Sequence, residues 1–550
     1  MKNLKQFANQ DKIQRFLVSL CILAVCIGTQ RMQTVKWNSG VIELSRDLLG
    51  VVMAVIIGTN YKWSDFVRYK IPYLIWTVLG VVLGIFLLPQ AIAKRLDFLA
   101  ADTIVIFIGM FFMGYCIIHT IISFFIEKYR PTFYRPLFFI WAAMMLLMIF
   151  SRSEYLWPLC YFILFLCYYL TKQTPSQREN VIEGVVNGII LGFIVIQAHS
   201  LLFRPYDRLR YYGNFCNPNH NSMFLCLCLG AILAKILLVT KANEKKWIRA
   251  FYFLMAGACC AFIFMTMCRS GYLAVFVVML VFLKAYCKIT EKKVFFKTGL
   301  LMVGIFIVLL PTTYLAVRYI PTIHPHVLFY FQEGYSEERV HSWDERNSEK
   351  FITFQQMMAG ALGRVGDIQS SLQNMQGMER MDQANPALLV ASGGDYVPSD
   401  LASYGETETD PDKIPALTDE EGESAFLIRY TIYKWYVTHL SLRGMPYDEQ
   451  GFQLTATHWI QDTHNIYLDY GINFGYPVMI LFIIFIWWGI GRLYGQGVRE
   501  KSAAKWTCLF IVLIPPVFGM FEFAWGAGMI STVAFYILFK EMFQENKVEA

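Results

Sequence analysis

Three separate segments of the chain carry side chains that suit the handling of an anionic group at a membrane. Arg210 follows one apolar run, Arg269 separates two others, and His464 stands just before a fourth. An arginine at membrane depth costs about 2.5–3.5 kcal/mol, so its presence needs a reason. Guanidinium groups stay charged and bind phosphate through two parallel hydrogen bonds, whereas an imidazole can accept a proton near neutral pH. Together these residue types predict a phosphate-binding site with a base beside it.

Each residue also has a simpler interpretation. Arg269 could mark the end of a span, and Arg204 and Arg208 could merely flank a helix end, which leaves Arg210 as the stronger candidate in its segment. His464 could be a general base, a cationic phosphate ligand, or part of a helix cap in which Asn465 positions the backbone.

The sequence around these residues predicts tight turns. Gly213 and the Asn-Pro-Asn run at 217–219 favour a re-entrant turn after Arg210. Irregular backbone near membrane depth is tolerated where it lines a cavity or is buried in protein. Two arginines and a histidine would then reach one membrane face from three junctions between loops and helices.

Composition indicates that these junctions belong to a membrane protein. Of 550 residues, 56% are hydrophobic and 16% are charged, against roughly a quarter charged in soluble domains. A spanning helix needs about 20 apolar residues, and the chain holds enough such runs to exclude a soluble enzyme with one anchor. We predict an all-α polytopic fold with about fourteen spans, at 14–30, 41–58, 71–92, 103–126, 136–150, 154–170, 183–203, 220–239, 250–268, 270–287, 298–319, 465–490, 506–522 and 524–539.

Charge predicts the orientation of these spans. With the N-terminus inside, the inside loops and the N-terminal segment through Arg15 hold 26 Lys and Arg residues, and the short outside loops hold 9. The positive-inside rule therefore predicts cytoplasmic termini in a multi-pass cytoplasmic (inner) membrane protein, without a cleavable leader. Residues 320–463 then form one large extracytoplasmic loop, which has 9 basic and 22 acidic residues.

This topology divides the chain into four parts. Residues 1–182 form N-terminal spans, 183–319 a core with Arg210 and Arg269, 320–463 the loop, and 464–550 the C-terminal spans. Apolar residues at helical spacing over 351–375 predict a helix that rests on the bilayer or packs inside the loop. The acidic run 392–423 is predicted to be flexible. The 13 cysteines lie mostly in apolar runs and are expected to act as small core residues.

The ordered motifs resemble the O-antigen ligase and O-antigen polymerase superfamily of integral membrane glycosyltransferases. The resemblance covers roughly residues 185–490, with a looser match from Glu423 to Trp435 and Gly444. Two features depart from the ligase pattern: Val478 replaces a usual Gly, Thr or Tyr, and the outer loop is longer. The motifs that match are Arg210-x2-Gly213 with Pro218-Asn219, then Cys268-Arg269-Ser270-Gly271, then His464-Asn465-x9-Gly475.

The resemblance implies a GT-C-like helical fold and a reaction on undecaprenyl diphosphate-linked glycan, with a glycan or lipid-glycan acceptor. It implies a catalytic role for His464, substrate binding by Arg210, Arg269, Arg429 and Asn465, and structural roles for Gly213, Pro218, Asn219, Gly271 and Gly475. No cofactor, metal, nucleotide sugar or nucleic acid is expected. The pair Asp410 and Asp412 has metal-ligand spacing but lies in the acidic run, and arginine can supply the counter-charge instead.

Two other classes remain open. A lipid-linked oligosaccharide flippase or transporter would also have many spans and buried arginines, but not a long loop that ends at His464-Asn465. A rod-shape peptidoglycan polymerase would need a catalytic carboxylate in the loop, and none stands out from the acidic background. Polymerase and ligase differ by their acceptor, and the incomplete ligase motif favours a surface-polysaccharide polymerase.

Overall fold

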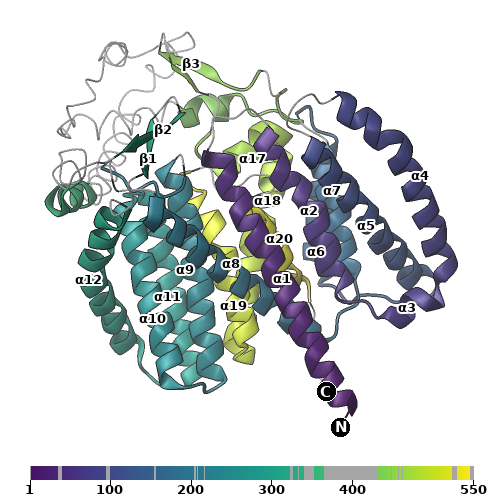
Figure 1. The fold of residues 1–550 in the computed structure, drawn as a ribbon, viewed down its shortest axis with the longest axis horizontal. Helices are drawn as coiled ribbons and strands as arrows, with labels where there is room; N and C mark the ends of the chain where they lie inside the picture. Colours follow the sequence, from purple (N-terminus) through teal and green to yellow (C-terminus); the bar gives the residue numbers. More distant parts are fainter. Residues whose placement is uncertain are drawn as a thin grey trace, which may run out of the picture.

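The computed structural model is a bundle of long helices with short strands gathered at one end (Figure 1). The residues that it describes are 2–34, 40–94, 100–153, 156–203, 206, 209–215, 217–321, 326–331, 334–339, 352–363, 432–446, 449–455, 458–460, 463–522 and 529–544.

The first part of the chain supplies one side of the bundle. Its helices are α1 (Lys2–Thr34), α2 (Gly40–Gly58), α3 (Trp63–Arg68), α4 (Lys70–Lys94), α5 (Ala100–Phe125), α6 (Arg135–Ile149) and α7 (Leu156–Leu170). The middle of the chain forms α8 (Pro175–Phe203), α9 (Pro218–Lys241), α10 (Lys246–Met265), α11 (Arg269–Thr290) and α12 (Phe295–Tyr319). The last helices are α17 (Ile466–Phe474), α18 (Tyr476–Glu500), α19 (Ala503–Phe518) and α20 (Ile530–Phe543).

Among the described residues, eight helices are long and apolar enough to cross a membrane. These are α4, α5, α8, α9, α10, α11, α12 and α18, and shorter apolar helices lie in α2, α6, α7 and α19. The described part of the chain therefore has the make-up of a polytopic membrane protein. Every predicted span overlaps a helix, although within the described ranges length and composition qualify only these eight as spanning candidates.

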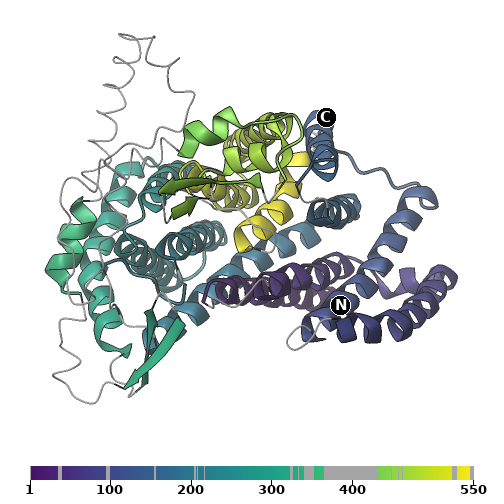
Figure 2. The ribbon, with the colours of Figure 1, turned by 90° about the horizontal axis from the view of Figure 1, so that it is seen from above.

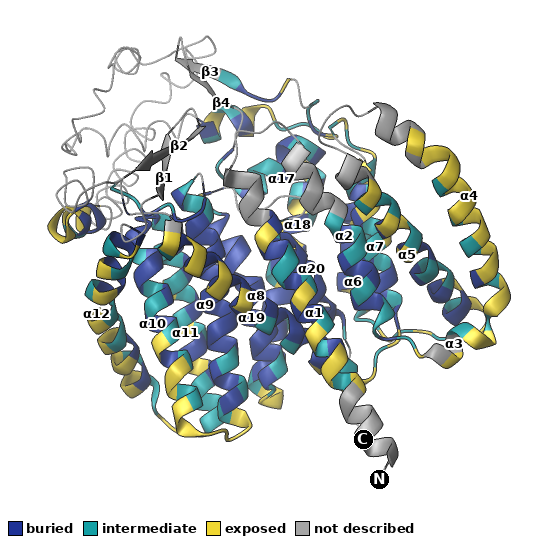
Figure 3. Cartoon of the chain, in the orientation of Figure 1, coloured by how far each residue is buried: buried dark blue, intermediate teal, exposed yellow. Residues whose placement is uncertain are grey.

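Burial separates central helices from peripheral ones (Figure 3). In α9, 83% of the apolar stretch Pro218–Lys241 is buried, whereas in α4 only 6% of the stretch Lys70–Leu87 is buried. The exposed residues of α4 are largely leucine, isoleucine, valine and phenylalanine, which suits contact with lipid. Figure 2 shows α17–α20 between α8–α12 and α6–α7, and α19 packs directly on α9 and α11. The C-terminal helices are thus central to the fold.

The predicted span 465–490 is two helices rather than one. Gly475 has a φ of +100° and separates α17 from α18, and Pro477 lies in the first turn of α18. A Cβ at Gly475 would lie 2.3 Å from the carbonyl oxygen of Leu442. The apolar pattern continues through this break, so hydropathy alone could not show it.

The structure has the predicted all-α class, and two short β-hairpins lie at the end of the bundle that holds the predicted loop. β1 (His326–Phe331) pairs antiparallel with β2 (Gly334–Arg339), and β3 (Phe452–Thr455) pairs antiparallel with β4 (His458–Ile460). Residues 354–363 are helical, which confirms a helix in part of the predicted amphipathic segment. The rest of that segment and the acidic run lie outside the described residues.

The cysteines fit the predicted core role. Those in the described residues are free thiols, and most are buried, including Cys226, Cys228 and Cys259 in the central helices. They pack as small apolar side chains.

Candidate functional site

The junction between α8 and α9 holds Arg210 against the end of α10. Its Nε donates to the carbonyl of Thr266 at 2.9 Å, and its Nη2 donates to the Oδ1 of Asn219. Asn217 caps α9 by accepting the backbone N–H of Asn219 at 2.8 Å, and Pro218 occupies the first helical position. Proline suits this position because its missing N–H would have had no partner in the helix. The capped turn therefore fixes the acceptor that orients Arg210.

Gly213 allows this junction to fold tightly. Its φ is +55°, and a Cβ there would lie 3.1 Å from the Nδ2 of Asn221 and 3.3 Å from the Oγ of Ser200. The backbone N–H of Tyr211 donates to the carbonyl of Met265 at 2.9 Å, which fastens the junction to the end of α10. The re-entrant turn predicted here is thus a packed segment at the ends of three helices.

The junction between α10 and α11 brings Arg269 to the same place. Cys268 is the N-cap residue of α11, and Arg269 begins that helix three residues after Thr266, which Arg210 contacts. Gly271 allows α11 to approach α9, since a Cβ there would lie 2.1 Å from the Oγ of Ser222. The structure therefore brings the first two predicted motifs together.

The third junction pairs His464 with a carboxylate that the sequence analysis did not select. The Nδ1 of His464 lies 3.5 Å from the Oε2 of Glu522, whose side chain is buried. The backbone N–H of Ile466 donates to the carbonyl of Gly519 at 2.8 Å, and the Nδ2 of Asn465 donates to the carbonyl of Met520 at 2.9 Å. These bonds hold the start of α17 on the end of α19, which places the carboxylate beside the imidazole.

Asn465 acts as the N-cap of α17. Its Oδ1 accepts the backbone N–H groups of Tyr467 at 2.9 Å and Leu468 at 3.1 Å. Its Nδ2 is bound to Met520, so the amide is engaged with the protein at both ends. The helix-cap interpretation thus describes Asn465 well, and its contact with substrate stays a prediction.

His464 adopts an unusual backbone conformation. Its φ is +48°, in the left-handed region that residues other than glycine seldom occupy. The Tyr433 hydroxyl donates to the His464 carbonyl at 3.2 Å, and the Thr463 hydroxyl donates to the Asn465 carbonyl at 2.8 Å. Such conformations cost roughly 1–3 kcal/mol and are found preferentially at functional sites.

The packing of α19 on α11 joins the histidine junction to the arginine junctions. Lys501, two residues before α19, pairs with Glu291, the residue after α11, so the two helices run antiparallel. The end of α19, on which the His464 junction rests, therefore lies at the start of α11, where Arg269 stands. His464, Glu522, Arg210 and the start of α11 form one cluster, which we call the polar junction.

The sequence contained a signal for Glu522. It is the sole acidic residue from Ala503 to Glu522, a segment that is otherwise strongly apolar. An ionisable residue at membrane depth is by default a candidate for function. Glu522 is also the last residue of the predicted span 506–522, and a charged residue at the end of a span is easily taken for a boundary.

The segment predicted to be the outer loop also reaches the polar junction. Arg429, Arg204 and Arg208 lie outside the described residues, but the helix at 432–438 contacts the His464 backbone through Tyr433. Gly444, with a φ of +77°, packs on the end of α17, where a Cβ would lie 2.2 Å from the carbonyl oxygen of Asn473. The glycine turn predicted after Trp435 is therefore in contact with the helix that follows His464.

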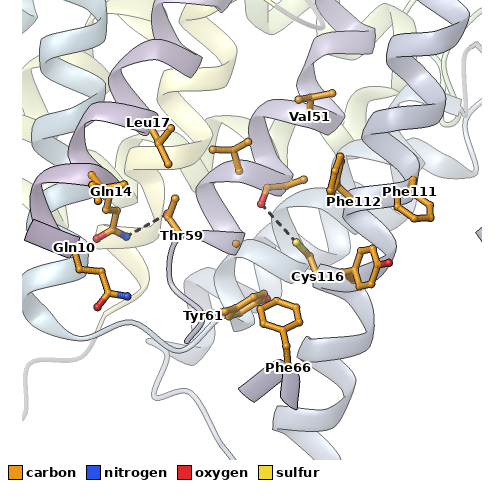
Figure 4. A pocket seen from close by; sticks show the side chains of 15 residues that line it. Gln10, Gln14, Leu17, Val51, Thr59, Tyr61, Phe66, Phe111, Phe112 and Cys116 are labelled. Carbon is orange, nitrogen blue, oxygen red and sulfur yellow. Dashed lines mark hydrogen bonds between the residues drawn. The ribbon is translucent and has the colours of Figure 1, made fainter. Parts of the chain in front are cut away.

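A large cavity lies in a different part of the fold. It has a volume of about 760 Å³ and is bounded by α1, α2, α3 and α5, with a mostly apolar lining that includes Leu17, Val51 and Phe111 (Figure 4). Its polar groups include Gln14, whose amide donates to Asn60 at 3.0 Å. None of the predicted site residues borders this cavity.

Within the described ranges, no three His, Cys, Asp or Glu side chains gather in a way that could hold a metal ion. Asp410 and Asp412 lie outside those ranges, so metal independence stays a prediction. Comparisons with protein-family models, curated proteins and solved structures found no match for this chain.

Proposed function

We propose that this chain is a membrane glycosyltransferase that transfers or polymerises glycan from an undecaprenyl diphosphate-linked donor onto an acceptor hydroxyl. The observation that supports this proposal most directly is the Glu522 carboxylate 3.5 Å from the His464 imidazole, beside the turn that Arg210 contacts. A base oriented by a buried acid can take the proton from an acceptor hydroxyl, and fixed cations next to it can stabilise a departing anion.

The proposed step balances as follows. The acceptor oxygen bonds to the anomeric carbon of the donor sugar while the bond from that carbon to the diphosphate oxygen breaks. The diphosphate leaves with the electron pair, and the hydroxyl proton passes to His464. Glu522 stabilises the resulting imidazolium, while Arg210 and Arg269 offset the negative charge that develops on the leaving diphosphate.

This chemistry uses no cofactor and no metal ion. Guanidinium groups remain charged at any pH of interest and match phosphate oxygens through paired donors, which is the role that a divalent cation has in other diphosphate sites. Transfer is therefore expected to proceed in a chelator. Loss of transfer in chelator, restored by one added metal, would contradict this part of the proposal.

We also propose a GT-C-like arrangement in which fourteen segments cross the inner membrane, the twelfth being α18 rather than the whole of 465–490. Both termini are then cytoplasmic and residues 320–463 are outside, in agreement with the charge asymmetry of the loops. Single cysteines at Ser403 and Ser502 should react with a membrane-impermeant thiol reagent from opposite sides. Labelling of both from one side would reject this topology.

The decisive experiment measures transfer by the purified protein from a lipid-linked donor. Glu522→Gln keeps the size of the side chain but removes its charge, so it should slow transfer while donor binding persists. Glu244→Gln is a matched control, since Glu244 is exposed in the loop between α9 and α10. Full activity in both variants would exclude the acid-base pair, and donor movement across vesicles without transfer would favour a flippase.

Surface glycan after gene deletion distinguishes the possible acceptors. Loss of long chains with single repeats retained would identify a polymerase, which the incomplete ligase motif favours. Accumulation of long lipid-linked chains would identify a ligase instead.

A further inference from the structure

The opposite end of α11 borders a cavity whose lining is strongly basic. α11 begins at the polar junction and ends at Thr290, and the chain turns there into α12. A cavity of about 680 Å³ lies at this turn, bounded by the last turns of α11, the first turn of α12 and the connection from α18 to α19. Its lining includes Lys284, Lys288, Lys292, Lys293, Lys297 and Lys501. We call these six residues the lysine pocket.

One acidic residue, Glu291, also lines the cavity, and it is already neutralised. Lys501 forms an ion pair with it, and the hydrogen bond from Lys501 lowers the pKa of the Glu291 carboxyl. Among the residues that line this cavity, the other five lysines have no acidic counterpart. The lining therefore presents a field of one sign that would attract an anion.

The backbone adds to this field. α12 is a 25-residue helix that begins at the cavity, and its first turn has no acidic side chain. Its unpaired N–H groups and the positive end of its dipole favour a negative group at this position. Lys297 lies in the same turn, so backbone and side-chain donors are available to one phosphate.

An apolar stripe leads away from the cavity along α12. Phe296 at its rim is 87% exposed, and Leu300, Val303 and Ile307 continue on nearly the same helical face, each at least half exposed. The stripe lies on a helix that is long and apolar enough to cross a membrane, and only 28% of that helix is buried inside the protein. A small soluble anion would contact the lysines but not this apolar stripe.

We propose that the lysine pocket binds the phosphate head group of an anionic phospholipid, whose acyl chains lie along the exposed stripe of α12. The number and spread of the lysines suit a lipid with two phosphates, such as a diphosphatidylglycerol. This inference does not depend on the proposed glycosyl transfer. It places a lipid site at the end of the helices that is remote from the polar junction.

Lipid retention by the full-length protein tests this proposal. The protein is reconstituted into nanodiscs of phosphatidylcholine with a minor fraction of cardiolipin, released into neutral detergent and examined by native mass spectrometry. Lys292→Gln, Lys293→Gln and Lys297→Gln together should weaken cardiolipin retention about 10- to 100-fold, given the usual contribution of a lysine near an anionic surface. Phosphatidylcholine retention should not change.

The matched control removes three lysines from the same end of the bundle but outside the pocket. Lys241, Lys245 and Lys246 lie in and beside the loop between α9 and α10 and are exposed. Their joint change to glutamine should leave cardiolipin retention nearly as in the unaltered protein. An equal loss in both triple variants would show a diffuse attraction and overturn the proposal.

Two further measurements keep the test decisive. Orthophosphate or pyrophosphate at the same phosphate concentration should fail to displace cardiolipin, and full displacement would indicate a soluble anion as the ligand. Phe296→Ser should also reduce retention severalfold with every lysine in place, which provides a readout if the triple variant does not fold. Unchanged retention in Phe296→Ser would reject the contact with the acyl chains.

Discussion

The two ends of α11 carry charge in opposite ways. At the polar junction the charged groups are few, of both signs, and held by named partners: Arg210 by Thr266 and Asn219, and Glu522 beside His464. At the lysine pocket they are many, mostly exposed, and almost all of one sign. Fixed and partly buried charges act through geometry, whereas exposed charges act through their summed field. Single substitutions should therefore matter greatly at the first end and little at the second.

The largest effect is expected from His464→Ala. General-base catalysis contributes typically about 10²- to 10⁴-fold, so transfer should fall by this factor while donor still binds. Transfer by the unaltered protein should also fall toward acid pH, because a protonated imidazole cannot accept the acceptor's proton. A turnover assay with purified donor over a pH series measures both.

His439→Ala is the control for that substitution. His439 is exposed and stacks on Trp435 at a ring-centroid distance of 4.1 Å, so its loss should leave transfer nearly unchanged. Rescue by His464→Arg with a reversed pH profile would instead assign His464 to phosphate binding. If His464→Asn leaves the rate of transfer unchanged, His464 serves only as part of the turn before α17.

The next largest effect is expected from Arg269→Lys. One ammonium cannot reproduce the planar pair of donors, and loss of a preorganised donor to a developing anion typically costs about 10²- to 10³-fold. Arg249→Lys, at the far end of α10 from the polar junction, is the control with the same chemical change. Transfer rates near normal in Arg269→Ala would contradict the diphosphate assignment and weaken the contrast between the two ends of α11.

Much of the scaffold could be predicted from the sequence, because runs of about 20 apolar residues are a local property. Arg210, Arg269 and His464 were also identifiable, since charged residues beside apolar runs need a reason. The pairing of His464 with Glu522 was not, because it depends on how α17 lies on α19. The break at Gly475 was hidden for a similar reason, since a positive φ leaves no mark on hydropathy.

That break gives a stability prediction. Gly475→Ala should destabilise the protein by about 1–3 kcal/mol, because alanine is strained at a φ of +100° and its Cβ would lie 2.3 Å from the Leu442 carbonyl oxygen. Gly495→Ala is the control: it lies within α18, where a Cβ would meet nothing within 4 Å. It should be neutral or slightly stabilising, since alanine is the better helix former.

Thermal unfolding in detergent measures both variants, and transfer should fall in Gly475→Ala alone because α17 positions His464. Equal melting temperatures for the two variants would show that the α17–α18 break does not constrain the polar junction.

The smallest effect is expected from single substitutions in the lysine pocket. Lys292→Gln removes one of six lysines, and a lysine near an anionic surface contributes about 1 kcal/mol, so cardiolipin retention should fall about fivefold or less. Transfer should not change, because the pocket lies at the other end of α11 from His464. Native mass spectrometry and the turnover assay on the same preparation measure the two quantities together. A single lysine that abolished retention would show that the pocket, like the polar junction, works through one fixed contact, and the contrast between the two ends of α11 would then be wrong.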